Sequence, residues 1–161
     1  MNTMAKSFLL GCAALCGSAT SSIACTGISL TAKDGSYVQA RTIEGAELKL
    51  ISEYVIIPRG HEMQSYTPNA RNGMKFTAKY GVVGLCVVEK EFIAEGINEA
   101  GLSTGLFFFP NYGSYLPYNP EEADRSVSDL QLNTWMLSQF ATVDEVKEAV
   151  TAGRVRVVGL D

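Results

Sequence analysis

The stretch Cys25–Glu44, CTGISLTAKDGSYVQARTIE, determines the first part of the predicted fold. Apolar and small polar side chains alternate from Ile28 to Ala32, and the pattern resumes from Tyr37 to Arg41. Alternation with a period of two is typical of a half-buried β-strand. Asp34-Gly35 lies between the two runs, and this dipeptide strongly favours a tight hairpin turn. The stretch therefore predicts two antiparallel strands joined near Asp34-Gly35.

The register of this hairpin decides which side chains lie beside Cys25. A two-residue turn places Cys25 opposite Glu44 and Ile28 opposite Arg41, whereas a one-residue bulge moves Arg41 to the face of Cys25 and turns Glu44 away. A cation close to a cysteine favours its thiolate form. The sequence leaves both registers open, and it equally allows a solvated hairpin edge at Arg41 and Glu44.

The residues before Cys25 have the pattern of a secretory signal peptide. Lys6 precedes an apolar run over residues 8–16, and Ser22 and Ala24 are small residues at positions −3 and −1 from Cys25. The apolar run is much shorter than the roughly 20 residues that span a bilayer. We expect cleavage before Cys25; an N-terminal core helix is the alternative.

This expectation divides the chain into a signal peptide, residues 1–24, and a mature domain, residues 25–161. The mature protein is then exported, either periplasmic or secreted, with no stable insertion in the membrane. Cys25 and Cys86 are the cysteines that remain, and they could form a disulfide in an oxidising compartment. Cys86 lies in the apolar segment GVVGLCVVE, which favours a buried thiol instead.

Composition describes one globular domain or a part of one. The chain has 161 residues, a formal net charge of −4 and 47% hydrophobic residues. It has no cluster of basic residues, so nucleic acid is not an expected partner. The single histidine, His61, lies in a polar segment, and no group of ligands has the spacing of a metal site. We expect a surface histidine there, and no metal or other cofactor.

The middle of the chain reads mainly as strands. Residues 54–57 form one predicted strand, and the near-continuous apolar character of residues 80–88 predicts another that is buried on both faces. Residues 92–102 predict a hairpin that turns at residues 98–101. The polar residues 59–73 predict a loop.

The last third changes to helical periodicity. Apolar residues recur at helical spacing over residues 130–140. Thr142 and Glu145 form a capping box that opens a second helix, which ends near Gly153. Residues 154–159 begin a strand that has no partner before the chain ends. Strands followed by helices indicate an α+β fold.

A cysteine released at the N-terminus carries a nucleophile and a base on one residue. The pKa of an α-amino group is about 7.7–8.0 and that of a free thiol about 8.5, so the amine can accept the thiol proton near neutral pH. The thiolate is the attacking species in cysteine hydrolases. Cys25 would therefore need no histidine partner.

The chain resembles the choloylglycine hydrolase family, which includes bile salt hydrolases and penicillin V acylases. The blocks that carry the resemblance are CTGISLTAKDGSYVQARTIE, YVIIPRG, KYGVVGL, EGINEAGLSTGLFFFP and TWMLSQFATVDEVKEAV. The resemblance implies an N-terminal nucleophile hydrolase that cleaves linear amide bonds, with an αββα sandwich built of antiparallel sheets and flanking helices. It implies a small-molecule amide substrate, such as a conjugated bile salt or penicillin V, and a homo-oligomer in the full-length form.

The resemblance also implies roles for individual residues. Cys25 matches the nucleophile, and Arg41 matches an arginine that stabilises the thiolate. Glu44 replaces the aspartate that contacts the amino group, which keeps the charge and adds a methylene. Phe108 replaces an asparagine of the bile salt hydrolases, and its backbone N–H would contribute to the oxyanion hole.

The aromatic residues around this position have two readings. In an amidase, Phe107, Phe109 and Tyr112 line the pocket for the acyl group; otherwise Phe107 and Phe109 are core residues. The resemblance places a second oxyanion asparagine and a further arginine beyond Asp161. We therefore expect this chain to be the N-terminal part of the sandwich, with little activity alone.

Two other functions remain open from the sequence. Cys25 could be a lipid acceptor that anchors an exported binding protein, although Ser22 stands where lipid attachment prefers leucine, and a strand follows at once. The segment LLGC12 is a better local match, but its apolar run is very short. Alternatively, the chain is a non-catalytic piece that folds with a partner through the aromatic segments at 106–109 and 112–118.

Overall fold

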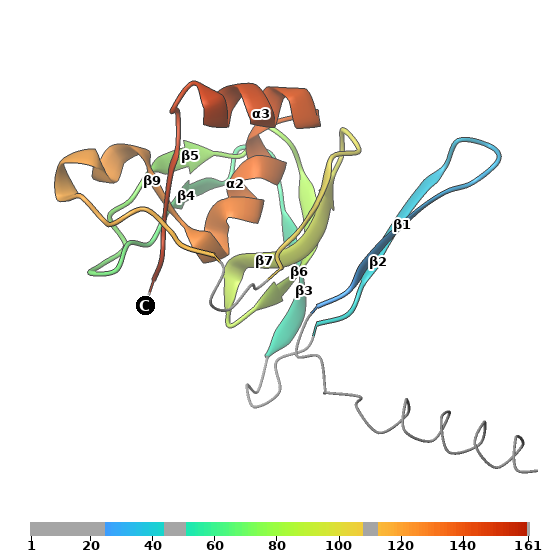
Figure 1. Cartoon of the computed structure of the whole chain (residues 1–161), viewed down its shortest axis with the longest axis horizontal. Helices are drawn as coiled ribbons and strands as arrows, with labels where there is room; N and C mark the ends of the chain where they lie inside the picture. The colour runs from blue at the N-terminus through green and yellow to red at the C-terminus, as the bar shows by residue number, and fades with distance from the viewer. Residues whose placement is uncertain (1–24, 44–50, 108–112, 161) are drawn as a thin grey trace, which may run out of the picture.

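The computed structural model of the chain describes residues 25–43, 51–107 and 113–160, and these form a mixed α+β structure (Figure 1). Most of the described chain gathers into one body, and the first hairpin projects from it (Figure 1). Within these ranges, no helix is long and apolar enough to cross a membrane.

The main body is organised around a four-stranded antiparallel sheet with the order β3-β6-β7-β8. Its strands are β3 (Ser52–Ile57), β6 (Val82–Val87), β7 (Glu89–Asn98) and β8 (Ser103–Gly105). The predicted strand at 54–57 and the hairpin with its turn at 98–101 are confirmed. Gly101 completes that turn with a φ of 91°, a conformation that glycine adopts without strain.

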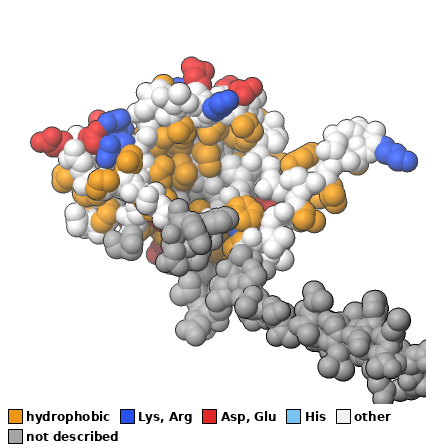
Figure 2. All heavy atoms as spheres, in the orientation of Figure 1, with side chains coloured by type: hydrophobic (Ala, Val, Ile, Leu, Met, Phe, Trp, Pro, Cys, Tyr) orange, Lys and Arg blue, Asp and Glu red, His pale blue; other side chains and the backbone are white. Residues whose placement is uncertain are grey.

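The hairpin that opens the described chain forms a separate two-stranded sheet. Its strands are β1 (Gly27–Thr31) and β2 (Tyr37–Arg41), which pair antiparallel as the sequence predicts. Ile28, Leu30 and Val38 are each more than half exposed, and Figure 2 shows hydrophobic side chains along this projecting arm.

Two further strand pairs correct the sequence prediction. The segment predicted as a polar loop contains β4 (Glu62–Gln64), which pairs with β5 (Lys75–Thr77). Met63 is buried in the core, and its two neighbours on the strand are polar. The strand expected to lack a partner, β10 (Arg156–Val158), pairs in parallel with β9 (Ser126–Ser128). Both misses come from strands of three residues, which are too short to show a clear period.

The predicted helices are present. Two short 3-10 segments, η2 (Pro120–Arg125) and η3 (Asp129–Gln131), lead into α2 (Leu132–Gln139). Helix α3 (Val143–Thr151) follows, and both hydrogen bonds of the Thr142–Glu145 capping box are formed. Gly153 follows α3 with a φ of 67°, which confirms the predicted end.

The core lies between the sheet and helix α2. Ile93 on β7 and Leu137 on α2 are fully buried there. A Cβ on Gly84 would lie 2.7 Å from Ile93, and one on Gly96 would lie 2.9 Å from Leu137. The sheet therefore requires glycine at these positions for the helix to pack closely.

Asn98 joins the sheet to α2 through its side chain. Its Nδ2 donates hydrogen bonds to the carbonyls of Leu137 and Phe140, at 2.8 and 2.6 Å. Its Oδ1 accepts from the N–H groups of Ala100 and Leu102, both at 3.0 Å. The side chain is 4% exposed, and its Nδ2 and Oδ1 atoms each have two hydrogen-bond partners. Asn98 therefore fixes the turn against the helix.

The opposite face of the sheet is open among the described residues. Tyr54 is 88% exposed, Ile56 78% and Val83 45%. The prediction that residues 80–88 are buried on both faces is therefore wrong for this structure, because α2 covers only the face that carries Val82 and Cys86. An apolar outer face on a sheet is unusual, since such a face normally packs on another layer.

Candidate active site

The β1–β2 hairpin turns through three residues rather than two. The Ala32 N–H donates to the Ser36 carbonyl at 2.8 Å, and the loop residues between them end at Gly35, whose φ is 86°. This is the three-residue hairpin with glycine in the left-handed position. The Ser36 backbone N–H donates to Asp34, which lowers the pKa of that carboxyl group and stabilises the turn.

The third loop residue shifts the register by one position. Gly27 lies directly opposite Arg41, and Ile28 lies opposite Ala40. Pairing continues toward Cys25, because the Thr42 N–H donates to the Thr26 carbonyl at 2.9 Å. The structure therefore selects the register that places Arg41 on the face of Cys25.

Cys25 and Arg41 are diagonal neighbours on that face. Cys25 lies two residues before Gly27, so the two positions share one side of the extended pair. Diagonal neighbours across an antiparallel pair are about 7–8 Å apart, within reach of a long side chain. Cys25 is half-buried and its thiol is free.

The Arg41 guanidinium is held by the main body. Its Nη1 donates to the Ala94 carbonyl on β7 at 3.4 Å, and its Nε donates to the Thr42 carbonyl at 3.2 Å. Its Cζ lies 4.6 Å from the centre of the Phe107 ring, which is a cation–π contact. Arg41 forms no ion pair with a described carboxylate.

Phe107 lies at the junction between the hairpin and the sheet. A Cβ on Gly27 would lie 2.7 Å from the ring, and one on Gly105 would lie 3.2 Å from it, so the ring contacts the backbones of β1 and β8. Beside this contact, Ser103 Oγ donates to Gln39 Oε1 at 2.7 Å. The junction therefore consists of the Phe107 ring, the Ser103–Gln39 hydrogen bond and the Arg41 contact with β7.

Sequence reasoning did not identify the residues of this junction other than Arg41 and Phe107. Gln39 has the one available signal, because it is a polar residue on the same strand face as Arg41, two positions earlier. Ala94 acts through its backbone carbonyl, and the glycines act by having no side chain, so neither has a chemical signature in the sequence.

Several predicted site residues cannot be placed. Glu44, Phe108, Phe109 and Tyr112 lie outside the described residues. The predicted contact of Glu44 with the amino group, the Phe108 oxyanion N–H and the pocket positions of Phe109 and Tyr112 remain predictions. Of the predicted pocket residues, Phe107 alone is described.

A groove of about 740 Å³ runs between the hairpin and the open face of the sheet. Tyr37 and Gln39 line it from β2, and Tyr54, Glu95 and Ile97 line it from the sheet. Its walls are largely apolar, with a few polar groups. This is the composition of many small-molecule sites.

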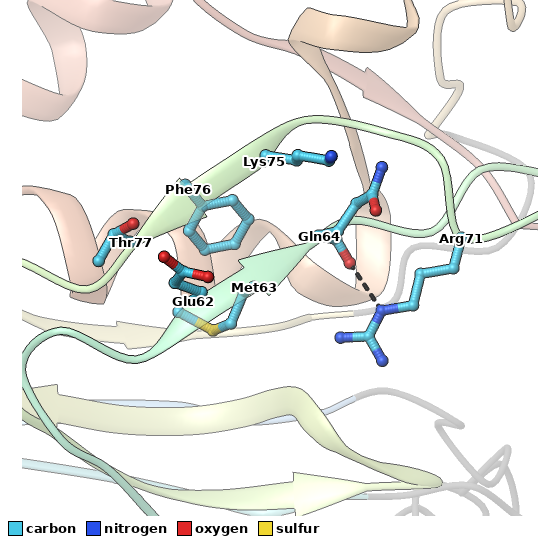
Figure 3. A pocket seen from close by; sticks show the side chains of 7 residues that line it. All are labelled: Glu62, Met63, Gln64, Arg71, Lys75, Phe76 and Thr77. Carbon is cyan, nitrogen blue, oxygen red and sulfur yellow. Dashed lines mark hydrogen bonds between the residues drawn. The ribbon is translucent and has the colours of Figure 1, made fainter.

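A second hollow of about 540 Å³ lies over β4 and β5 (Figure 3). Arg71 reaches over its edge, where its Nε donates to the Gln64 carbonyl at 3.1 Å. The same guanidinium donates to both carboxylate oxygens of Glu91, at 2.7 and 2.6 Å. Because Arg71 is already bound and no predicted site residue lines this hollow, we assign it no catalytic role.

The remaining candidates behave as the sequence predicts. His61 is exposed on the surface. Cys86 is 3% exposed and its thiol is free, so it is a buried apolar residue and not a disulfide partner of Cys25 in this structure.

Comparison with protein families identifies the chain. The sequence model described as linear amide C–N hydrolases, choloylglycine hydrolase family, matches residues 25–158. The chain belongs to the choloylglycine hydrolase family. The match begins at Cys25, the residue at which the sequence predicts the mature protein to start.

Curated relatives of the choloylglycine hydrolase family agree with this assignment. The bile salt hydrolase/transferase of Clostridium perfringens is 31% identical over 128 residues, which cover 78% of this chain and 37% of that protein. The bile salt hydrolase/transferase of Bifidobacterium longum subsp. longum is 26% identical, with 78% and 38% covered. The chain therefore spans a little over a third of the length of the relatives it matches.

The structure of the chain is similar to a part of two larger solved structures. An arginine-to-leucine variant of the conjugated bile acid hydrolase from Clostridium perfringens superposes with a TM-score of 0.64 at 28% identity, covering 82% of this chain and 38% of that one. Penicillin V acylase from Agrobacterium tumefaciens gives a TM-score of 0.58 at 23% identity, covering 83% and 36%. The second similarity supports the fold alone.

Proposed function

We propose that the chain is the N-terminal part of an exported amidase that uses Cys25 as an N-terminal nucleophile. The observation that carries this proposal is the hairpin register, which places Arg41 on the Cys25 face and opposite Gly27. The family match beginning at Cys25 supports it independently. The substrate class that follows is a linear amide with an apolar acyl group, such as a conjugated bile salt or penicillin V.

The proposed reaction uses both groups of Cys25. The α-amine accepts the thiol proton, the thiolate attacks the amide carbonyl, and the amine returns the proton to the leaving nitrogen as the C–N bond breaks. Water then hydrolyses the acyl-thioester, with the same amine as base. Arg41 stabilises the thiolate, and the backbone N–H of Phe108 stabilises the oxyanion.

The open face of the sheet fits the proposed sandwich. Tyr54, Ile56 and Val83 form an apolar surface that a second sheet would cover. In the αββα architecture that we propose for the complete protein, this surface lies between the two sheets. The second oxyanion donor and the further arginine would come from the part of the protein that adds this layer.

A single-turnover experiment tests the proposal without requiring fast turnover. The exported chain is incubated with glycine-conjugated bile salts or with penicillin V, and its mass is measured after acid quenching. We expect an adduct with the mass of the acyl group on the peptide that contains Cys25, and none in Cys25→Ala. Cys86→Ala is the matched control and should keep the adduct, because Cys86 is buried in the sheet.

The controls separate the chemistry from the fold. Adduct formation on Cys86, or an equal adduct in Cys25→Ala, would rule out Cys25 as the nucleophile. Urea unfolding of each variant establishes that the compared chains are folded to the same extent.

A further inference from the structure

We propose that Phe107 is the positioning residue that holds the Arg41 guanidinium at the Cys25 end of the hairpin. The effect on Cys25 rests on the proposed function, because it requires that Arg41 stabilise the Cys25 thiolate. The contact between Phe107 and Arg41 does not depend on the reaction. It assigns to Phe107 a task beyond lining the acyl pocket.

Arg41 needs a support from outside the hairpin. The hairpin projects from the main body as a two-stranded sheet, and an isolated two-stranded hairpin is marginally stable in water. Arginine has many rotamers, and holding it in one conformation has an entropic cost. Among the described residues, the contacts that hold its guanidinium are the Ala94 and Thr42 carbonyls and the Phe107 ring.

The Phe107 ring supports the guanidinium from outside the hairpin. The hydrogen bond to Ala94 is long, at 3.4 Å, and the bond to Thr42 lies within the hairpin itself. The Phe107 ring presents its face 4.6 Å from the Arg41 Cζ. A cation over an aromatic face at this distance is attracted to the ring, and the planar guanidinium is well suited to it.

The backbone on both sides of the Phe107 ring fixes its position. Gly27 and Gly105 leave room for it, since a Cβ at either position would lie 2.7 or 3.2 Å from ring atoms. Gly27 is also the residue directly opposite Arg41. The ring thus occupies the space next to Gly27 that a larger side chain would fill. The Arg41 guanidinium lies over the face of this ring.

Two measurements on the full chain test the role. The ¹⁵N relaxation order parameter of the Arg41 Nε–H group reports whether the side chain is held in one conformation, and it does not depend on the ring current of Phe107. The rate at which iodoacetamide alkylates Cys25, resolved by peptide mapping, reports the effect on the thiol. The variants are Phe107→Leu, which removes the π face, and Phe107→Tyr, which retains it; Phe76→Leu in β5 is the matched control.

We expect Phe107→Leu to lower the Arg41 Nε–H order parameter toward that of a solvated arginine and to slow alkylation by about 2- to 5-fold, the effect of losing a cation–π contact. Phe107→Tyr should restore most of both values, and Phe76→Leu should change neither. In an Arg41→Gln background, Phe107→Leu should have no further effect on alkylation, because Phe107 acts through Arg41.

The outcomes separate this proposal from the proposed function. An unchanged Arg41 order parameter in Phe107→Leu overturns the positioning role. So does an equal slowing of alkylation by Phe107→Leu in the Arg41→Gln background. A lowered Arg41 order parameter with unchanged alkylation supports the positioning of Arg41 by Phe107 and contradicts the proposed stabilisation of the Cys25 thiolate by Arg41.

Discussion

Gly27 lies directly opposite Arg41 in the β1–β2 hairpin, and the Phe107 ring occupies the space where a Gly27 side chain would be. The three residues come from β1, β2 and the segment after β8, so this contact is one of those that join the hairpin to the sheet.

Gly27→Ala is expected to disturb this junction. The new Cβ would lie 2.7 Å from the Phe107 ring, so the ring or the strand must move. We expect the free energy of unfolding to fall by about 1–3 kcal/mol and the alkylation of Cys25 to slow. Urea unfolding and peptide-resolved alkylation measure the two effects.

The matched control is Gly81→Ala, where the nearest atom is the flexible end of Glu99 at 3.4 Å. If Gly27→Ala and Gly81→Ala had the same small effect on Cys25 alkylation, the close contact at Gly27 would have no functional consequence.

Asn98→Ala should destabilise the main body strongly. The substitution removes the donors to Leu137 and Phe140 and the acceptor for Ala100 and Leu102, in a site that is 4% exposed. Buried groups left without partners cost about 1–3 kcal/mol each, so we expect a loss of about 3 kcal/mol or more in urea unfolding. The half-buried Asn119, which caps η2, offers the comparison: Asn119→Ala should lose about 1 kcal/mol. Equal losses would contradict the structural role of Asn98.

Thr142→Ala should weaken the start of helix α3. The Thr142 hydroxyl accepts from the Glu145 N–H at 3.2 Å, and the Glu145 carboxylate accepts from the Thr142 N–H at 3.1 Å. Loss of an N-cap hydroxyl costs about 1 kcal/mol. Thr151→Ala, at the other end of the same helix, should cost less, because its hydroxyl bonds back to the Lys147 carbonyl within the helix. A larger loss in Thr151→Ala would argue against the capping box as the main stabilising contact.

Stability should decrease in acid through Glu99 in particular. The hydrogen bond from Arg59 and then the Gly81 N–H hold the pKa of Glu99 below its usual value of 4.5. A carboxyl whose pKa is lower in the folded chain stabilises the fold above its unfolded pKa, and this contribution is lost as the pH falls through the folded pKa. The free energy of unfolding should therefore fall with decreasing pH below about 4.5.

Glu99→Gln and Arg59→Gln should both reduce that pH dependence, because each removes one partner of the 2.5 Å pair. Urea midpoints measured between neutral pH and acid test this. An unchanged slope in both variants would show that other carboxyl groups account for the acid sensitivity.

The sequence predicts the longer elements well and the short ones poorly. Alternation over 28–32 and the Thr142–Glu145 capping box identify the hairpin and α3, because both patterns are local. The strand Glu62–Gln64 is missed because only Met63 carries an apolar signal, and its partner is more than ten residues away. The partner of β10 is a polar strand of three residues, Ser126–Ser128, whose pairing depends on the tertiary structure.

The sequence proposes candidate residues for the site, and it specifies their geometry only in part. Cys25 and Arg41 are evident from their chemistry and from the family resemblance. Their relative placement depends on one additional loop residue before Gly35, which shifts every later pair by one position. The support from Phe107 and from the Ala94 carbonyl depends on contacts across 50 or more positions of the chain, which a local pattern does not encode.

The most direct test of the central claim is the intact mass and N-terminal sequence of the exported chain. We expect the exported protein to begin at Cys25, with a free α-amine and an unmodified thiol. A chain that retains residues before Cys25, or one that carries a diacylglyceryl group on the Cys25 sulfur, would contradict it. Either result would remove the nucleophile, and the lipid-modified form would indicate an anchored binding protein.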